Sequence, residues 1–241
     1  MVIEIENIYK DYSNSFSHFK LEIPKIQFET GIVTFLMGHN GSGKSVFLKI
    51  ISDEIQNDKK LNILIEGKNT KIKGFAKILR QKAIENLALE LTVKENFIIH
   101  FQTKKLIEKL LPSIFLKNYI YSRISSSRFL KEKENQIVNE LSGGQQQTLA
   151  FFVTASSKSK MLLLDEFLAA TDMDTTNTLL SESKKYAKEN DASVVIVSHD
   201  IDVALNNADK IFVFSNGLLE HEIAKGNSEW DKENLQSYLR L

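Results

Sequence analysis

The stretch Gly38-His39-Asn40-Gly41-Ser42-Gly43-Lys44-Ser45 decides how this chain folds and what it binds. It has the form GxxxxGKS, in which glycines let successive backbone N–H groups turn toward phosphate oxygens. An apolar run at residues 32–37 precedes it, and a helical pattern at 44–52 follows it. A buried strand, a glycine-rich loop and a helix start predict a nucleotide-phosphate site; the alternative is an ordinary glycine turn.

Within this loop, each polar side chain has an expected task. Lys44 is expected to reach the β- and γ-phosphates of a nucleotide, and the Ser45 hydroxyl is expected to bind Mg²⁺. The backbone N–H groups of the loop and the positive end of the following helix would hold the remaining phosphate charge. The loop therefore predicts nucleotide and Mg²⁺ as ligands.

A second element, Met161-Leu162-Leu163-Leu164-Asp165-Glu166, ends a buried strand with two carboxylates. The carboxyl ends of parallel strands are where α/β proteins place ligand groups. We expect Asp165 to hold Mg²⁺ and Glu166 to polarise or deprotonate an attacking water. Such a run alone is also typical of a solvated strand end, and only its pairing with the phosphate loop favours a catalytic interpretation.

Composition limits the class of protein. The chain has 241 residues, 31 basic and 31 acidic side chains, and no cysteine. The balanced charge argues against a nucleic-acid binder, which needs clustered Lys and Arg. The absence of cysteine excludes disulfides and thiolate metal sites. The first residues alternate and carry acid, and the longest apolar runs are far below the ~20 residues of a membrane helix. We therefore expect a soluble chain that reaches a membrane only through partners.

The coarse pattern along the chain is that of a parallel α/β protein. Alternating runs at 2–9 and 21–28 predict half-buried strands, and further strands are expected at 61–66, 75–79, 161–165, 193–198 and 210–214. The pattern is helical from 92 to about 139, and a closing helix is expected over 227–241 with Ser228 as its N-cap. Strands alternate with helical stretches, as in a parallel sheet.

One further stretch identifies the family that the chain resembles. Leu141-Ser142-Gly143-Gly144-Gln145 matches the signature motif of ABC transporter ATPase subunits, and the resemblance covers nearly the whole chain. The family would place Ser142, Gly143 and Gly144 at a helix start, where they bind the γ-phosphate of an ATP held by the opposite protomer. Small residues and free N–H groups at a helix N-terminus suit that task.

The resemblance also assigns roles to scattered residues. Gln81 matches the Q-loop glutamine that senses Mg²⁺ and water, and His199 matches the switch histidine that contacts the γ-phosphate. Tyr12 resembles the aromatic that stacks on adenine, with Tyr9 and Phe16 as competitors. Asp172 matches the D-loop aspartate. Taken alone, a surface glutamine, a structural histidine or a packing aromatic would be the ordinary interpretation.

Several positions depart from the family pattern. Val46 stands where Thr is usual, so a side-chain contact to the α-phosphate is lost and only the backbone N–H remains. Phe167-Leu168 replaces the usual Pro-Thr after the glutamate, and Thr171 replaces a common Leu. The groups nearest the chemistry are all retained, so the resemblance implies a working ATPase with ATP and Mg²⁺.

The resemblance implies one ABC ATPase domain over residues 1–241, of the α/β class. A P-loop NTPase core of the RecA-like type, with an antiparallel β layer, would hold about 1–90 and 158–241. An inserted α-helical subdomain would hold about 91–157.

The implied partners are a second ATPase protomer, transmembrane permease subunits and, for an importer, a solute-binding protein, at the cytoplasmic face of the membrane. The sequences at 85–89 and 165–170 resemble those of a bacterial branch of the family, whose members are thought to serve importers of amino-acid-like solutes. The alternative is a soluble ABC ATPase that handles DNA or ribosomes, which the length and the lack of a basic stripe disfavour. A plain P-loop kinase or GTPase would leave residues 141–145 unexplained.

Overall fold

The computed structural model describes residues 1–13, 18–102, 128–169 and 171–239. Phe16, Ala170 and the part of the expected helical stretch at 103–127 lie outside the described residues. The chain forms two compact units, each built from separated segments. The first unit comprises Met1–Ile78, Ser159–Glu166 and Leu180–Leu241, and the second comprises Leu79–Lys158 and Phe167–Leu179.

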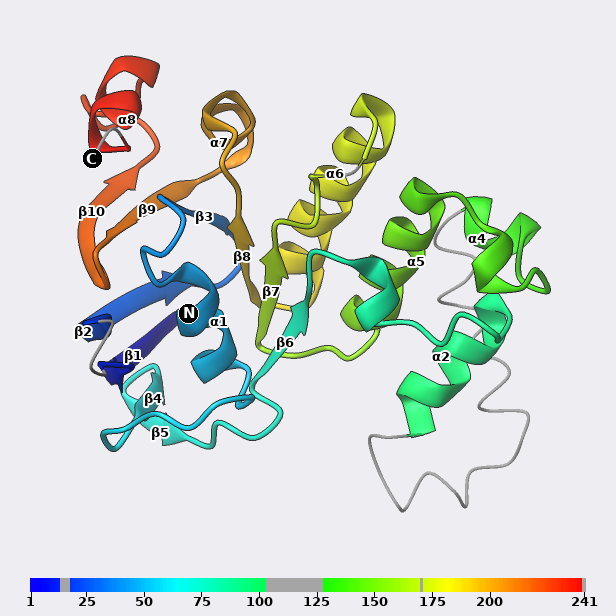
Figure 1. Cartoon of the computed structure of the whole chain (residues 1–241), viewed down its shortest axis with the longest axis horizontal. Coiled ribbons are helices and arrows are strands. Elements are labelled where there is room, and N and C mark those ends of the chain that lie inside the picture. The colour runs from blue at the N-terminus through cyan, green and yellow to red at the C-terminus, as the bar shows by residue number, and fades with distance from the viewer. Residues whose placement is uncertain (14–17, 103–127, 170, 240–241) are drawn as a thin grey trace. The chain divides into compact units, whose positions relative to one another are not determined.

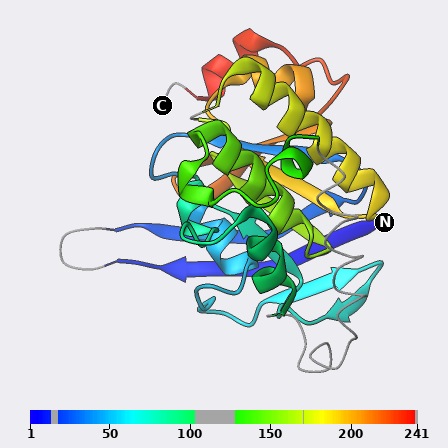
Figure 2. The same ribbon diagram turned by 90° about the vertical axis from the view of Figure 1, so that its right-hand side faces the viewer.

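The first unit contains an antiparallel sheet of four strands in the order β2-β1-β4-β5. Its strands are β1 (Val2–Asp11), β2 (Lys20–Glu29), β4 (Asn62–Ile65) and β5 (Lys68–Thr70). Figure 2 shows β1 and β2 side by side as a long ribbon. In β2 every second residue from Leu21 to Ile23 is buried, and Ile26 and Phe28 continue the buried face. The antiparallel layer that the family resemblance implies is confirmed.

A second sheet has six strands in the order β10-β9-β3-β8-β7-β6 (Figure 1). Strand β3 (Val33–Gly38) pairs in parallel with β8 (Ser193–Val197) and with β9 (Lys210–Ser215). Strand β7 (Met161–Asp165) pairs in parallel with β8, and β6 (Ala76–Leu79) lies at one edge. The opposite edge is β10 (Leu218–Ala224), antiparallel to β9, which the sequence analysis did not anticipate.

Helix α1 (Lys44–Ile51) packs between the two sheets. Phe28 of β2 lies 6.1 Å from Phe47 of α1 and 5.3 Å from Phe212 of β9, measured between ring centroids. All three rings are fully buried, so one apolar core joins the helix to both sheets. This packing fixes the start of α1 at the carboxyl end of β3, where the phosphate loop lies.

The second unit is helical. Its elements are η1 (Ala83–Glu85), α2 (Val93–Gln102), α4 (Arg128–Glu132), η3 (Val138–Glu140), α5 (Gly143–Ala155) and the first part of α6 (Met173–Glu189). Val93, Phe97, Leu130, Val138 and Leu149 are among its buried core residues. The helix of the sequence prediction is therefore divided by turns into shorter helices among the described residues.

The last helices are α7 (Ile201–Asn207) and α8 (Lys232–Tyr238). The N-cap of α8 is Asp231, whose carboxylate accepts from the N–H of Asn234 at 2.8 Å, so the prediction of Ser228 was wrong. The Ser228 hydroxyl instead bonds the side chain of Asn227, within a turn that precedes the helix. Within the described ranges, no helix combines the length and apolarity that a bilayer crossing requires.

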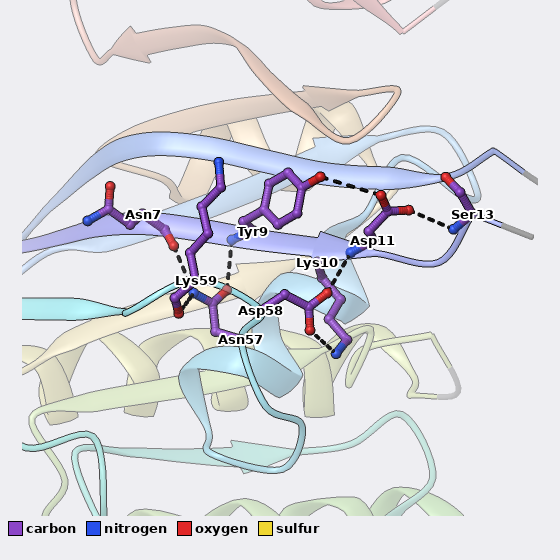
Figure 3. Close-up of polar contacts among 8 residues, drawn as sticks. All are labelled: Asn7, Tyr9, Lys10, Asp11, Ser13, Asn57, Asp58 and Lys59. Atoms are coloured by element: carbon purple, nitrogen blue, oxygen red, sulfur yellow. Dashed lines mark hydrogen bonds and ion pairs between the residues drawn. The ribbon is translucent and has the colours of Figure 1, made fainter.

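A polar network fastens the loop after α1 to strand β1 (Figure 3). The Asn57 side chain accepts from the N–H of Tyr9 at 2.7 Å and donates to the carbonyl of Asn7 at 2.7 Å. Asp58 accepts from the N–H of Asp11 at 2.9 Å and pairs with Lys10. We name residues 57–58 the β1 clamp, because their side chains satisfy backbone groups of β1 beyond its pairing with β4.

Candidate functional site

The phosphate loop has the backbone that a phosphate cradle needs. Gly38, Gly41 and Gly43 all have positive φ, at 145°, 82° and 106°. A Cβ on Gly38 would lie 2.2 Å from the carbonyl oxygen of Phe214, so only glycine fits there. A hydrogen bond from the turn after β9 also holds the loop, since the Gly217 N–H donates to the carbonyl of Ser42 at 3.0 Å. The loop is thus preformed by its contacts with β9 and the turn after it.

Lys44 lies over this loop and is 5% exposed. Its ammonium donates to the carbonyls of Gly38 at 2.7 Å and His39 at 2.8 Å. Burial lowers the pKa of Lys44, while the carboxylates of Glu166 and Asp165 oppose that shift. The cation is therefore partly desolvated and close to both acids, which favours strong binding of a phosphate oxygen.

Asp165, at the end of β7, carries a buried oxygen, Oδ1, without a hydrogen-bond partner. Burial raises the pKa of Asp165 and the Glu166 charge adds to this, while Lys44, Lys49 and a hydrogen bond from Ser45 oppose it. An orphaned carboxylate oxygen next to a serine hydroxyl fits Mg²⁺, which takes one or two protein oxygens together with substrate phosphates. No group of three or more His, Cys, Asp or Glu that could bind a metal occurs in the described part of the chain. The donor set therefore suits a metal shared with a nucleotide.

Glu166 and His199 meet at the same edge of the sheet. The Nε2 of His199 lies 2.9 Å from Oε1 of Glu166, and both side chains are partly exposed to solvent. His199 follows β8, which is the strand between β3 and β7. Because the carboxyl ends of parallel strands share one edge, the fold brings together the phosphate loop, Asp165, Glu166 and His199.

A cavity of about 330 Å³ lies against the phosphate loop. Its lining residues are Phe19, Asn40, Gly41, Gly43, Lys44, Ser45, Val46 and Glu166. Tyr12 is not among them; it is 43% exposed, and its ring centroid lies 6.4 Å from that of Phe19. Tyr9 is engaged elsewhere, with the Lys59 ammonium 4.0 Å above its ring. The aromatic in contact with the cavity is Phe19, which the sequence analysis missed because it directly precedes a strand and reads as a core residue.

The remaining predicted residues lie in the second unit and are described within it. Ser142 caps α5: the Gln145 side chain accepts from the Ser142 N–H at 3.1 Å, and the Ser142 hydroxyl accepts from the Gln145 N–H. Ser142 and Gly143 are exposed and Leu141 is buried. The predicted helix start at the signature is therefore present, with its polar residues open to solvent.

Two other predicted residues also belong to this unit. Gln81 is exposed and lies between β6 and η1. Asp172 caps α6 by accepting from the N–H of Thr175 at 2.7 Å, a hydrogen bond that holds the pKa of Asp172 below its usual range. Both residues belong to the second unit, and their roles toward ATP stay predictions.

Comparisons with known proteins agree with this arrangement. A family model described as "ABC transporter" matches residues 21–169. The spermidine/putrescine import ATP-binding protein PotA of Clostridium novyi is 30% identical over 232 residues, with 91% of this chain and 61% of that protein covered. A tyrosine transport ATP-binding protein of Clostridioides difficile is 28% identical over 252 residues, with 97% and 95% covered. The chain spans about three-fifths of the length of the first curated relatives that it matches.

Solved structures give the same fold. A dimeric ATP-binding cassette in a post-hydrolysis state, bound to ADP and Pi, superposes with a TM-score of 0.77 at 24% identity, covering 93% of this chain and 99% of that one. A nucleotide-free cassette from an ABC transporter gives a TM-score of 0.75 at 23% identity, with 100% and 95% covered. At this identity the likeness establishes the fold alone.

Proposed function

Because this chain belongs to the ABC transporter family, as the family match over more than half of its length shows, we propose that it is the subunit that binds and hydrolyses ATP to energise a membrane transporter. One observation carries the proposal. The phosphate loop, Asp165 with its buried Oδ1, and the Glu166–His199 pair lie at the carboxyl ends of the parallel strands of one sheet. A phosphate-binding cation, a carboxylate for Mg²⁺ and a candidate base for the attacking water are thus present together in the first unit.

The residues suggest how hydrolysis proceeds. Lys44 and the loop N–H groups bind the phosphates. Glu166 accepts a proton from the attacking water while the oxygen of that water forms a bond to the γ-phosphorus. The bond from the γ-phosphorus to the β–γ bridging oxygen breaks, giving ADP and phosphate. His199 would contact the γ-phosphate and hold the attacking water, and its 2.9 Å contact with Glu166 would orient the carboxylate toward that water. Ser45 and Asp165 would bind Mg²⁺, which neutralises phosphate charge when present.

The same proposal covers the partners. The exposed Ser142 and Gly143 at the start of α5 would bind the γ-phosphate held by a second ATPase protomer. Gln81 would sense Mg²⁺ and water as the Q-loop glutamine, and Asp172 would be the D-loop aspartate. Tyr12 would stack on adenine, with Phe19 beside it. Separate permease subunits would form the path through the membrane, and this chain would bind them at the cytoplasmic face. All 241 residues would form one ABC ATPase domain, with its helical part at about 91–157.

We propose that the transported solutes are amino-acid-like and that a solute-binding protein delivers them to the transporter. The tyrosine transport relative, matched over 95% of its length, supports it. Relatives named for polyamine, methionine and tungstate import support import over export without favouring one solute. A role in handling DNA or ribosomes has no support among these relatives.

The test separates binding from chemistry. Lys44→Ala should weaken ATP binding by about 10- to 100-fold in calorimetry, because a charge-assisted phosphate contact is lost. Glu166→Gln should bind Mg-ATP with near wild-type affinity but hydrolyse it at least about 100-fold more slowly, because the amide cannot accept the proton. Wild-type protein that shows no Mg-dependent ATP turnover, or Glu166→Gln that turns over normally, would contradict the proposal.

A further inference from the structure

The nucleotide site of the first unit is assembled from two separate parts. The phosphate loop lies between β3 and α1, whereas Phe19, which lines the same cavity, directly precedes β2. Phe19 is paired with Tyr12 across the ribbon of β1 and β2, since the Tyr12 N–H donates to the Phe19 carbonyl at 2.9 Å. We name these two residues the aromatic end of the ribbon. A nucleotide with its phosphates in the loop and its base at the aromatic end must fit both parts at once.

The turn between β9 and β10 joins the two parts. It consists of Asn216 and Gly217, with φ of +48° and +80°, a conformation that Asn-Gly favours in tight hairpins. The Gly217 N–H donates to the carbonyl of Ser42 in the phosphate loop at 3.0 Å. The Gly217 carbonyl accepts from the Glu22 N–H of β2 at 2.8 Å. One residue thus bonds the loop through its amide and the ribbon through its carbonyl.

The fit of the ribbon on Gly217 leaves no space for a side chain. A Cβ there would lie 1.7 Å from the carbonyl oxygen of Lys20 and 3.2 Å from Cα of Leu21. The three nearest atoms all belong to the ribbon, so any displacement would fall on the ribbon first. Lys20 directly follows Phe19, and a Cβ on Gly43 of the loop would itself lie 3.2 Å from Cζ of Phe19. Displacement at Lys20 would therefore separate the aromatic end from the loop.

We propose that Gly217 is a positioning residue for nucleotide binding, which sets the distance between the phosphate loop and the aromatic end of the ribbon. It contacts no part of the nucleotide and acts through its two backbone hydrogen bonds. The pairing of β3 with β9 fixes where the loop begins, at Gly38 opposite Phe214, but it does not bond the ribbon. This inference rests on the proposed function, because it requires that the site binds ATP.

Gly217→Ala tests the proposal with two ligands in calorimetry. Mg-ATP reaches the loop and the aromatic end, whereas Mg-tripolyphosphate reaches the loop only. A base stacked on an aromatic side chain contributes roughly tenfold to affinity, so the preference for Mg-ATP over Mg-tripolyphosphate should fall by about tenfold in the variant. Mg-tripolyphosphate should bind within about twofold of wild type, because the N–H groups of the loop remain. The binding stoichiometry reports the folded fraction.

Gly67→Ala is the matched control. Gly67 holds the same place in the β4–β5 turn, with φ of +74°, but a Cβ there would meet nothing within 4 Å. This variant has the same backbone strain without the collision, so it should lower the Tm and leave both dissociation constants unchanged. Phe19→Ala should reproduce the loss of preference. The double variant Phe19→Ala with Gly217→Ala should lose little more, because both changes remove the same contact.

If Gly217→Ala does not fold, hydrogen exchange of the wild type provides the test. Opening of the turn would separate the two parts of the site, so Mg-ATP should slow exchange of the Glu22 amide by at least about fivefold, and Mg-tripolyphosphate should slow it less. Equal losses for the two ligands in Gly217→Ala, or a Glu22 amide that Mg-ATP leaves unprotected, would overturn the proposal while ATP binding itself stands. If wild type did not bind Mg-ATP, the proposed function and this inference would both fall.

Discussion

At the scale of single residues, Asp165 occupies an environment that opposes its charge. Burial raises its pKa, the adjacent Glu166 charge raises it further, and Oδ1 has no hydrogen-bond partner. The folded protein therefore holds the Asp165 proton to a higher pH than the unfolded chain does. Between those two pH values the folded state binds more protons, so its stability falls as pH rises, and the loss remains at neutral pH.

Asp165→Asn should consequently raise the Tm of the protein by a few degrees at pH 7, since the amide carries no charge to desolvate. The gain should shrink as pH falls below the range in which the folded carboxyl titrates, because the wild-type side chain is then neutral too. Thermal melts from pH 4 to pH 8 measure this. The same variant should lose the Mg²⁺ dependence of ATP binding, so stability and function change in opposite directions.

Asp172→Asn provides a control of opposite sign. The Thr175 N–H lowers the pKa of Asp172, so the folded state favours its charge, and that stability is present at neutral pH and lost in acid. This variant should melt at or slightly below the wild-type temperature at pH 7, because Asn caps helices nearly as well. A stabilised Asp172→Asn, or an Asp165→Asn gain that does not vary with pH, would contradict the electrostatic explanation.

At the scale of elements, the β1 clamp shows how a loop is attached to a strand without joining the sheet. Asn57 is half-buried and satisfies the N–H of Tyr9 and the carbonyl of Asn7, a residue with φ of +61°. Asn57→Ala should cost about 1–2 kcal/mol of unfolding free energy, because backbone groups of β1 lose their partners. Urea unfolding measures it.

Lys10→Ala is the comparison, since it removes the ion pair to Asp58 and a 5.8 Å contact of the ammonium with the Tyr12 ring but no backbone hydrogen bond, and it should cost less than about 1 kcal/mol. Asn57→Ala should keep the wild-type affinity for ATP. Equal losses in Asn57→Ala and Lys10→Ala would mean that the backbone hydrogen bonds of Asn57 contribute little.

The elements also show what the sequence could predict. The buried strands β3, β7 and β8 were predictable because continuous apolar runs bounded by glycine or acid have few other interpretations. Lys44 was predictable from the glycine-rich loop that follows β3, and Asp165 because it ends the apolar run of β7, whereas His199, two residues after β8, was assigned through the family resemblance. Strand β10 and the Asp231 cap were missed, since edge strands alternate weakly and several polar residues compete for a cap. The cavity position of Phe19 and the hydrogen bonds of Gly217 to Ser42 and Glu22 depend on contacts between distant residues, which no local pattern encodes.

At the scale of the whole molecule, the proposed site is incomplete in one chain, because its signature residues are expected to serve a partner's ATP. Glu166→Gln should retain bound ATP and so shift from monomer to dimer with Mg-ATP, as measured by light scattering. Ser142→Arg, introduced into Glu166→Gln, should abolish that shift while the monomer still binds ATP, because Ser142 would touch only the partner's nucleotide.

Ser142 is also the N-cap of α5, so its replacement removes a cap of about 1 kcal/mol. Ser142→Asp keeps the cap and places a negative charge opposite the phosphate, and it should block the dimer as well. Loss of ATP binding by the isolated Ser142→Arg monomer would contradict a site shared between protomers. If a paralogous subunit is the true partner, the shift should appear only when that subunit is added.

The order of strands in the central sheet has a consequence for synthesis on the ribosome. Strand β3 pairs with β8 and β9, so Val33 cannot pair until Val194 has been synthesised, and Thr34 cannot pair until Lys210 has been synthesised. The chain grows at about 5–20 residues per second, so the apolar strand before the phosphate loop emerges roughly 10–30 s before either neighbour exists. During that interval this strand is open to wrong pairing. The nascent chain should therefore depend on chaperones more than the stability of the folded protein would suggest. Nucleotide binding should become possible only during the last third of translation, when β8 and β9 have been made.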